Sequence, residues 1–487
     1  MEYDKDLRSI QEARDLIKNA KVAQKQLANW SQAEIDKLTK HICESCVRNA
    51  EPLAKLAQEE TGFGKWEDKI LKNLLGSKMT YEAMENLKTV GIIREDRAGR
   101  FFEVAVPVGV VVALIPSTNP TSTVMYKSLI SLKAGNAIII SPHPSAKNCI
   151  FETVKIIQKA CKECGAPDNI VQVVQTPTMQ ATDTLMKHKD TGLILATGGE
   201  AMVHAAYSEK SADIPTAVRR IVESKTFDNG TICASEQSVI TQECIKDQVV
   251  AEMKRQHCYF MRPDEIEKVG KFIMRANNTM NPAIVGKSAQ VIAKMASIDI
   301  PNDTLILVAE TTKIGKDNPY SREKLCPILA FFTVKNWEEA CDKSIEILEN
   351  EGTGHTMTIH SSDEEIIRQF GLRKPVSRVL VNVAAALGGV GALTGLQPAL
   401  TLGCGAVGGS ASSDNIGPMN LLNIRRVAYG TMELADLRRE VAQLQTSPSG
   451  AASCSQPQHK PCGEAELTKN QIEEITKEVL RSILANR

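Results

Sequence analysis

From Gly99 onward, short apolar segments alternate with amphipathic helical segments, and this alternation constrains the fold more than any other feature. The apolar runs VVVALI (110–115) and NAIIIS (136–141) are strand-like, and a helical pattern over 146–164 separates the second run from another strand at 169–175. Strands that are apolar on both faces and alternate with helices are typical of a parallel sheet covered on both sides. The sequence therefore predicts an α/β fold.

The rest of the chain extends this pattern. The first ninety residues carry apolar positions at helical spacing, so they are expected to form helices. The segments TLILVAE, ILAFFTVK, TMTIHS and RVLVNVA are expected strands of a second α/β domain, which ends near residue 415. Residues 420–435 are strand-like again.

One place interrupts the alternation. A strand at 191–197 runs into Gly198-Gly199, and the helix that follows is expected to reach Tyr207-Ser208. Ser211-Ala212-Asp213 then caps the next expected helix, IPTAVRRIVESKTF. Only two residues lie between the two helices, so a returning strand has no room, and we expect a strand of the sheet to be missing here.

Composition excludes several classes of protein. The chain carries 58 Lys+Arg and 58 Asp+Glu, which argues against a nucleic-acid-binding protein. No apolar run approaches the roughly twenty residues of a membrane helix, and the charged N-terminus does not resemble a signal peptide. Thirteen cysteines, spread over 487 residues, favour reduced thiols and a cytoplasmic protein rather than a disulfide framework.

The C-terminal part differs in composition. Residues 446–463 are rich in Ser, Pro, Gly and Gln and are expected to be a flexible linker. Residues 464–487 carry one apolar stripe opposite charged side chains, which predicts an amphipathic helix. A single helix on a tether cannot bury such a stripe alone, so it should dock on a partner or on the body of its own chain.

The strongest local signal for chemistry is FDNGTICAS, which contains Cys233. The cysteine follows a turn-forming Asp-Asn-Gly group and precedes small residues, so backbone N–H groups would lower its pKa and a substrate would reach it. Considered alone, one cysteine of thirteen is better explained as a buried, unreactive thiol.

Three further segments are candidate binding or catalytic loops. Asn119 lies in PSTNPT, a polar loop after an expected strand, where its amide would donate to an oxyanion or would only cap a helix. Thr197 and Gly198 open a glycine turn, which would either bind a phosphate or be only a tight turn. His355 lies in GTGHT, where it would act as an acid or base or would be only a solvated loop residue. The two Cys-x2-Cys pairs, starting at Cys43 and Cys161, fall within helical patterns, so no metal site is predicted.

Together these motifs resemble the aldehyde dehydrogenase superfamily, specifically its CoA-acylating branch, which includes the propionaldehyde and acetaldehyde dehydrogenases of bacterial microcompartments. The resemblance covers roughly residues 5–435. It rests on ETGFGKWEDKILKN (60–73), PSTNPTST (116–123), SLISLKAGNAIIISPHPSAK (128–147), LATGGEAMV (195–203), SKTFDNGTICASEQS (224–238), GTGHT (352–356) and LTLGCGAVGG (400–409).

The resemblance implies an organisation into parts. A Rossmann-type NAD domain would span 1–220 and a catalytic α/β domain 221–415. The strand near 99–108 and the return segment 416–445 would form an oligomerisation flap, giving a homodimer or homotetramer. The linker 446–463 and the helix 464–487 resemble peptides that bind microcompartment shell proteins, so the enzyme would lie in the cytoplasm inside such a compartment.

The resemblance also implies a reaction, in which a short-chain aldehyde, CoA and NAD+ give acyl-CoA and NADH. Cys233 matches the nucleophile, Asn119 the oxyanion donor, and His355 a base or CoA-positioning group. Residues that match cofactor contacts are Glu323 at the nicotinamide ribose, Ser141 and His143 at the adenosine, and Thr197 and Gly198 at the pyrophosphate.

The chain departs from this family after Ser208. Acylating relatives carry about twenty further residues there, with a strand and a glycine-rich stretch. The chain is therefore expected to be incomplete or altered relative to an active parent, and an inactive or structural cargo protein is one alternative. Hydrolytic oxidation to a free acid is another, but the chain has no glutamate that matches the hydrolytic base. The chain length of the aldehyde, and NAD rather than NADP, cannot be read from one sequence.

Overall fold

The computed structural model describes residues 4–197 and 205–446. The chain divides into two compact units, Met1–Ala428 and Tyr429–Arg487. The second unit contains one helix among its described residues, α16 (Leu434–Thr446), with Leu434 and Leu437 exposed. The predicted linker and all of the predicted amphipathic helix lie outside the described residues, apart from Thr446 at the end of α16.

Helices form the N-terminal part of the first unit, as predicted. They are α1 (Lys5–Leu27), α2 (Gln32–Arg48), α3 (Ala50–Thr61), α4 (Trp66–Leu74) and α5 (Thr80–Met84), with a π-helical turn, Leu75–Met79, before α5. The Cys-x2-Cys cysteines lie in helical segments: Cys43 and Cys46 in α2, Cys161 in α7 (Lys147–Glu163), with Cys164 as its C-cap.

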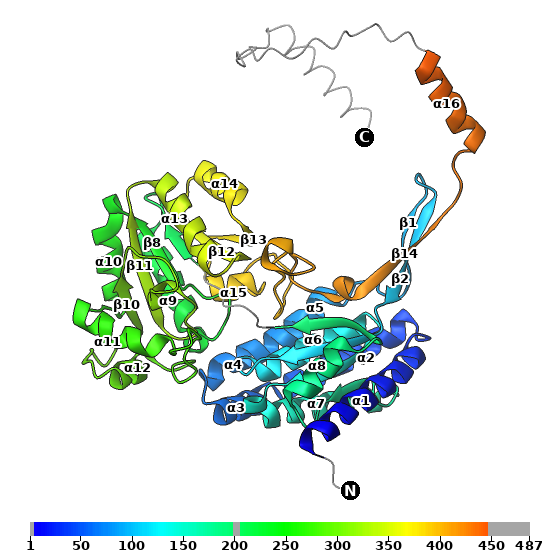
Figure 1. Cartoon of the computed structure of the whole chain (residues 1–487), viewed down its shortest axis with the longest axis horizontal. Helices are drawn as coiled ribbons and strands as arrows, with labels where there is room; N and C mark the ends of the chain where they lie inside the picture. The colour runs from blue at the N-terminus through cyan, green and yellow to red at the C-terminus, as the bar shows by residue number, and fades with distance from the viewer. Residues whose placement is uncertain (1–3, 198–204, 447–487) are drawn as a thin grey trace. The chain divides into compact units, whose positions relative to one another are not determined.

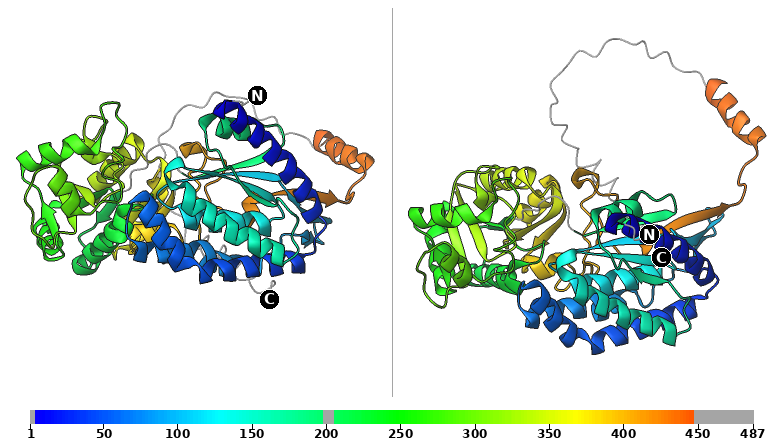
Figure 2. Two further views of the ribbon diagram at one scale, coloured as in Figure 1. Left: turned by 90° about the horizontal axis from the view of Figure 1, so that it is seen from below. Right: turned by 60° about the horizontal axis from the view of Figure 1, so that its bottom comes forward.

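A four-stranded parallel sheet follows, in the order β5-β4-β3-β6. Its strands are β3 (Val110–Ile115), β4 (Ala137–Pro142), β5 (Val171–Val173) and β6 (Thr191–Ala196). Helices α6 (Pro120–Lys133) and α7 contact one face, while α1 and α8 (Met179–Lys187) contact the other (Figures 1 and 2). The parallel sheet covered on both faces is therefore confirmed, with β5 shorter than predicted.

A second, seven-stranded parallel sheet has the order β13-β12-β7-β8-β11-β10-β9 (green to yellow in Figure 1). Its strands are β7 (Ala205–Ser208), β8 (Ser238–Gln242), β9 (Cys258–Phe260), β10 (Ile306–Glu310), β11 (Ile328–Val334), β12 (Gly354–His360) and β13 (Val376–Val381). The helices in this part are α9 (Ile214–Thr226), α10 (Lys246–Arg255), α11 (Pro263–Ile273), α12 (Ala289–Met295), α13 (Trp337–Asn350), α14 (Glu364–Arg373) and α15 (Ala385–Gly389).

The expectation of a missing strand after Gly199 is wrong. Residues 205–208, which were expected to end a helix, form β7 and pair in parallel with β12 and β8. The short apolar sequence AAYS fits a fully buried strand as well as a helix, and pairing on both sides decides for the strand. The beginning of the expected helix, including Gly198, lies outside the described residues.

A three-stranded antiparallel sheet joins distant parts of the chain. It consists of β1 (Gly91–Asp96), β2 (Phe101–Pro107) and β14 (Leu422–Ala428) in that order. The two segments predicted to form a flap thus pair with each other, in register from Leu422 with Pro107 to Ala428 with Phe101. The strand predicted over 420–435 is shorter than expected, because α16 begins at Leu434.

Candidate active site

Cys233 lies in a tightly turned loop between α9 and β8. The turn Phe227–Gly230 places Asp228 at φ 48° and Asn229 at φ 51°, and both values lie in the left-handed region. Such a conformation costs roughly 1–3 kcal/mol for each non-glycine residue, so it persists only where the surroundings hold it. Gly230 continues the turn at φ 77°, where its missing Cβ would stand 3.1 Å from the carbonyl group of Cys326.

The group that holds this loop is the fully buried carboxylate of Asp228. It accepts hydrogen bonds from Lys69 Nζ at 2.9 Å, from Lys72 Nζ, from the backbone N–H of Lys65 at 2.7 Å and from Thr231 Oγ1 at 2.7 Å. Burial alone would raise the pKa of Asp228, but the two ammonium groups hold it below its ordinary value. Helix α4 and its N-cap residue, Lys65, thus hold the nucleophile loop through one ionised carboxylate.

Asn119 connects the first sheet to the same cluster. It follows the carboxyl end of β3 and is the N-cap of α6, as the sequence predicts. Its Oδ1 accepts a hydrogen bond from Lys72 Nζ at 2.7 Å, and its Nδ2 donates to Thr118 Oγ1 at 3.1 Å. Because Lys72 also donates to Thr231 Oγ1 at 3.0 Å, one side chain joins the Asn119 amide to the loop of Cys233.

The pKa of Cys233 moves in the direction opposite to the expected one. Burial, with a further contribution from the negative charge of Glu323, raises it to about 12. Arg378 and the backbone N–H of Cys233 act in the other direction but do not compensate. Cys233 is half-buried rather than open. A pKa of about 12 favours the thiol over the thiolate at neutral pH.

His355 lies at the amino end of β12 and is buried, so its interpretation as a solvated loop residue is wrong. Its Nδ1 is 2.9 Å from Thr356 Oγ1. Arg378 Nε donates to the same hydroxyl at 3.2 Å, and its Nη2 donates to the carbonyl of Gly403 at 2.6 Å. Cys233, Glu323 and His355 all precede or begin strands of the seven-stranded sheet, at its amino edge.

Three of the residues predicted to bind a dinucleotide, Ser141, His143 and Thr197, lie at the carboxyl edge of the four-stranded sheet. Ser141 and the end of β6 flank the end of β3, and the Ser141 hydroxyl is 3.2 Å from that of Thr182. Thr197 follows β6, and its hydroxyl is 2.9 Å from that of Thr401. His143 caps a short turn through Nδ1, which lies 2.8 Å from Ser145 Oγ.

Sequence reasoning missed several buried charged residues around this region. They are Lys69, Lys72, Asp228, Arg378 and Glu236. Glu236, three residues after Cys233, accepts a hydrogen bond from the backbone N–H of Ala385 at 3.1 Å, and burial raises its pKa to about 7. Lys69 and Lys72 lie in a motif that the family resemblance already contains, but charged residues on a helix are usually solvated, so the motif alone gave no signal.

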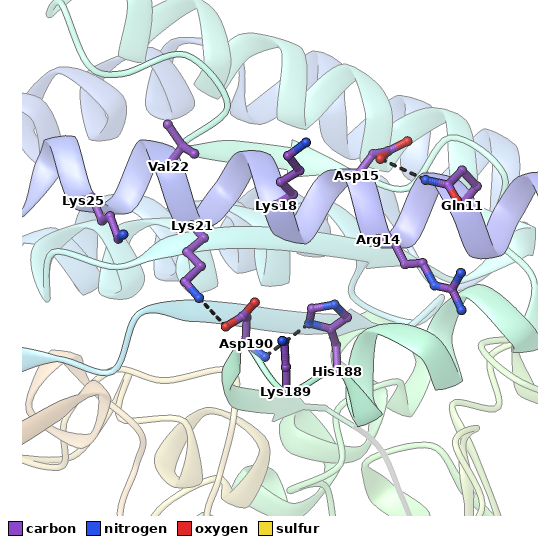
Figure 3. A pocket seen from close by; sticks show the side chains of 10 residues that line it. All are labelled: Gln11, Arg14, Asp15, Lys18, Lys21, Val22, Lys25, His188, Lys189 and Asp190. Atoms are coloured by element: carbon purple, nitrogen blue, oxygen red, sulfur yellow. Dashed lines mark hydrogen bonds and ion pairs between the residues drawn. The ribbon is translucent and has the colours of Figure 1, made fainter.

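A surface hollow of about 510 Å³ lies elsewhere, between α1 and the turn before β6 (Figure 3). Its walls are mostly basic: Arg14, Lys18, Lys21, Lys25, His188 and Lys189. Lys21 pairs with Asp190 across it. No predicted site residue lines this hollow, so it takes no part in the site assembled above.

Comparisons with known proteins place the chain in a family. The model of the aldehyde dehydrogenase family matches residues 7–211. The bifunctional aldehyde-alcohol dehydrogenase of Escherichia coli K12 is 37% identical over 442 residues, with 86% of this chain and 50% of that protein covered. Succinate-semialdehyde dehydrogenase (acetylating) of Clostridium kluyveri is 36% identical over 437 residues, with 86% and 96% covered. This chain spans about half the length of the bifunctional relatives it matches.

The alignment lengths bear on the segment expected after Ser208. Since 86% of 487 residues is about 419, the 442-residue alignment contains about twenty positions that this chain does not fill. This surplus has the size of the segment that acylating relatives were expected to carry there.

Solved structures agree with these relatives. A probable aldehyde dehydrogenase of Listeria monocytogenes has 56% identity and a TM-score of 0.88, covering 90% of this chain and 100% of that one. An acetylating aldehyde dehydrogenase of Geobacillus thermoglucosidasius has 48% identity and a TM-score of 0.87, covering 89% and 99%.

A propionaldehyde dehydrogenase from the fucose utilisation microcompartment of Clostridium phytofermentans is more distant. It has 26% identity and a TM-score of 0.77, covering 86% of this chain and 97% of that one. The chain therefore belongs to the aldehyde dehydrogenase family, within the acylating branch that these relatives represent.

Proposed function

We propose that this chain catalyses the CoA-dependent oxidation of a short-chain aldehyde, propionaldehyde or acetaldehyde, to acyl-CoA with reduction of NAD+. The observation that carries the proposal is the contact made by Lys72, which joins the amide of Asn119 to Thr231, two residues before Cys233. This contact supports a site in which an amide next to the first sheet and a thiol next to the second act together, as acyl transfer through a cysteine requires.

In the first step, the thiol of Cys233 adds across the aldehyde carbonyl: sulfur bonds to carbon, and the thiol proton ends on oxygen. An N–H of Asn119 and the backbone N–H of Cys233 stabilise the negative charge that develops on that oxygen. A thiol whose pKa is about 12 needs such stabilisation, because little thiolate exists at neutral pH. Loss of a hydride and a proton from the adduct leaves a thioester on Cys233.

In the second step, the thiol of CoA attacks the thioester, so acyl-CoA leaves and Cys233 regains its proton. His355 is the candidate base or CoA-positioning group for this step. Its ring is held through Thr356, whose hydroxyl also binds Arg378. Arg378 thus fixes the position of the imidazole from the neighbouring strand.

The chemistry of the described residues fits a nicotinamide dinucleotide. When bound, it accepts the hydride that the adduct on Cys233 loses. The hydroxyls of Ser141 and Thr197 and the imidazole of His143 stand at the carboxyl edge of the parallel sheet, where such folds bind nucleotides, and Gly198 would continue this contact. Glu323, whose negative charge raises the pKa of Cys233, would hold the nicotinamide ribose.

The test is NADH formation at 340 nm from propionaldehyde and NAD+, with and without CoA, on protein whose intact mass matches 487 residues. We expect turnover that depends on CoA, with comparable or lower rates for acetaldehyde and for NADP+. Turnover without CoA would instead indicate hydrolytic oxidation. No turnover, from folded protein of the correct mass, would contradict the proposal and favour a structural role.

One observation favours that alternative, an inactive or structural cargo protein. Ser208 in β7 stands in register with His360 and Thr241, and within the described part of the chain the side-chain polar atoms of all three are buried without a hydrogen-bond partner. Unpaired buried polar groups cost about 1–3 kcal/mol each. The short β7 therefore fits its neighbours poorly, which is expected where a segment has been lost.

We further propose partners for two segments. The sheet of β1, β2 and β14 would pair subunits into a homodimer or homotetramer, because its outer strands expose apolar residues such as Ile92 and Val427. The tail would bind a microcompartment shell protein and place the enzyme inside the compartment in the cytoplasm. No helix among the described residues is long and apolar enough to cross a membrane.

Removing residues 447–487 should separate shell binding from catalysis. The shortened protein should keep its kcat within about twofold, because no proposed catalytic residue lies there. It should lose co-sedimentation with purified shells, which the full chain retains. A shortened protein that still co-sediments with shells would contradict the role of the tail.

A further inference from the structure

The motif ETGFGKWEDKILKN (60–73) has a structural role that its family resemblance leaves unassigned. It forms α4 and the turn before it, and both surround Asp228, 155 or more residues later in the chain. Gly64 allows this approach, because a Cβ there would stand 1.8 Å from Asp228 Oδ1. Two lysines of α4 meet the carboxylate, but only one of them also reaches Asn119.

Lys72 dictates how the amide of Asn119 is turned. An ammonium group only donates hydrogen bonds, so the atom 2.7 Å from Lys72 Nζ has to be the amide oxygen of Asn119. The amide nitrogen then faces away from Lys72 and has two N–H groups. One of them donates to Thr118 Oγ1, and the other has no hydrogen-bond partner among the described residues. If the amide of Asn119 were rotated by half a turn, its N–H groups would face the buried ammonium of Lys72, and two donors would meet.

The position of Lys72 is itself fixed. The side chain is 2% exposed, and its three N–H groups are shared among Asn119, Asp228 and Thr231. Burial lowers its pKa to about 8, while Asp228 opposes that change and keeps the ammonium form present near neutral pH. Thr231 in turn donates to Asp228, so the amide and the nucleophile loop share one rigid polar cluster.

We propose that Lys72 is a positioning residue, which aims the free N–H of Asn119 at the carbonyl oxygen of an aldehyde attached to Cys233. This inference rests on the proposed function, since it gives Asn119 the oxyanion role. It explains why a buried lysine is present beside a carboxylate that Lys69 already neutralises.

The test is a double-mutant cycle between Lys72→Met and Asn119→Ala, read as kcat with aldehyde, NAD+ and CoA. Loss of one oxyanion donor lowers kcat by about 10²–10³-fold, so Asn119→Ala should fall in that range. Lys72→Met should lower kcat by about 10–100-fold, because the amide is no longer held, with little change in KM. In the Asn119→Ala background the same substitution should cost less than about threefold, because two residues that act as one unit are non-additive.

Lys69→Met is the matched control. Lys69 lies on the same helix and binds the same carboxylate, but its other contact is the backbone carbonyl of Thr118 rather than the amide of Asn119. Lys69→Met should change kcat by the same factor in the wild-type background and in the Asn119→Ala background. Both lysine variants should fold, because each leaves one lysine paired with Asp228.

A second readout separates positioning from damage to the loop. Alkylation of Cys233 by iodoacetamide should proceed within about twofold of the wild-type rate in Lys72→Met, because the thiol itself is unchanged. If Lys72→Met does not fold, Lys72→Leu, which also removes every N–H donor of the side chain, replaces it in the same cycle.

Three results would overturn the inference. They are equal costs of Lys72→Met in both backgrounds, a fall in alkylation parallel to kcat, and full activity of Asn119→Ala. The first two leave the proposed function intact, since the unsubstituted chain is still active. Inactivity of the unsubstituted chain would refute both this inference and the proposed function.

Discussion

Replacing Cys233 by alanine should lower CoA-dependent NADH formation by at least about 10⁴-fold, because loss of a covalent nucleophile removes the whole two-step route and leaves only binding. The structure supports this choice among the eleven cysteines that it describes. Cys233 alone follows the strained turn at Asp228 and Asn229, whereas thiols such as Cys43 and Cys326 are buried in the core.

Cys404→Ala is the matched control. Cys404 is near enough to Cys233 that its charge affects the pKa of Cys233, and Arg378 acts on both thiols. It belongs to no proposed catalytic step, so its replacement should leave kcat within about fivefold. The measurement is the initial rate at 340 nm, with folding checked by circular dichroism. Residual activity above one per cent in Cys233→Ala, or equal losses in both variants, would remove Cys233 from its role.

Local patterns were enough to predict most of the fold. Residues 138–140 are all isoleucine, and three consecutive large apolar residues fit a strand buried on both faces, as β4 is. The segment 205–208 was misread because it is short and its residues Ala-Ala-Tyr-Ser suit either structure. Its state is decided by Thr358 to His360 on one side and by Ser238 to Thr241 on the other, which are distant in sequence.

The site was predictable only in part, for a similar reason. Cys233, Asn119 and His355 lie in short sequences rich in Gly, Pro and small polar residues, and such sequences stand out against the apolar ones. Lys72 does not stand out, since a lysine on an amphipathic helix is normally solvated. Only the folded chain shows that its partner, Asp228, lies 156 residues away. The pKa of Cys233 depends in the same way on burial and on Glu323, neither of which local sequence reveals.

Replacing Asp228 by alanine should destabilise the first unit by about 3–5 kcal/mol, the usual cost of removing one partner from a buried ion pair. Two ammonium groups, Lys69 and Lys72, would remain buried side by side, and the hydroxyl of Thr231 and the N–H of Lys65 would lose an acceptor. The left-handed turn at Asp228 would also lose the contacts that hold it.

The loss should depend on pH in a defined direction. Without the carboxylate, the pKa of Lys72, which burial already lowers to about 8, falls further in the folded state, so the unfolded chain binds more protons. Stability then rises with pH across this range, and the deficit relative to the parent should be smaller at pH 9 than at pH 6.5. Urea unfolding of both proteins at the two pH values measures this.

Asp183→Ala is the control, since Asp183 forms an exposed pair with Lys187 at 2.8 Å and its loss should cost less than about 1 kcal/mol. A deficit for Asp228→Ala as small as that of the control, or one that is equal at both pH values, would mean that the two buried lysines do not depend on this carboxylate. The grip of α4 on the nucleophile loop, and with it the coupling of Lys72 to Asn119, would then need another source. A large, pH-dependent deficit would instead tie the stability of the fold to the same charges that arrange the site.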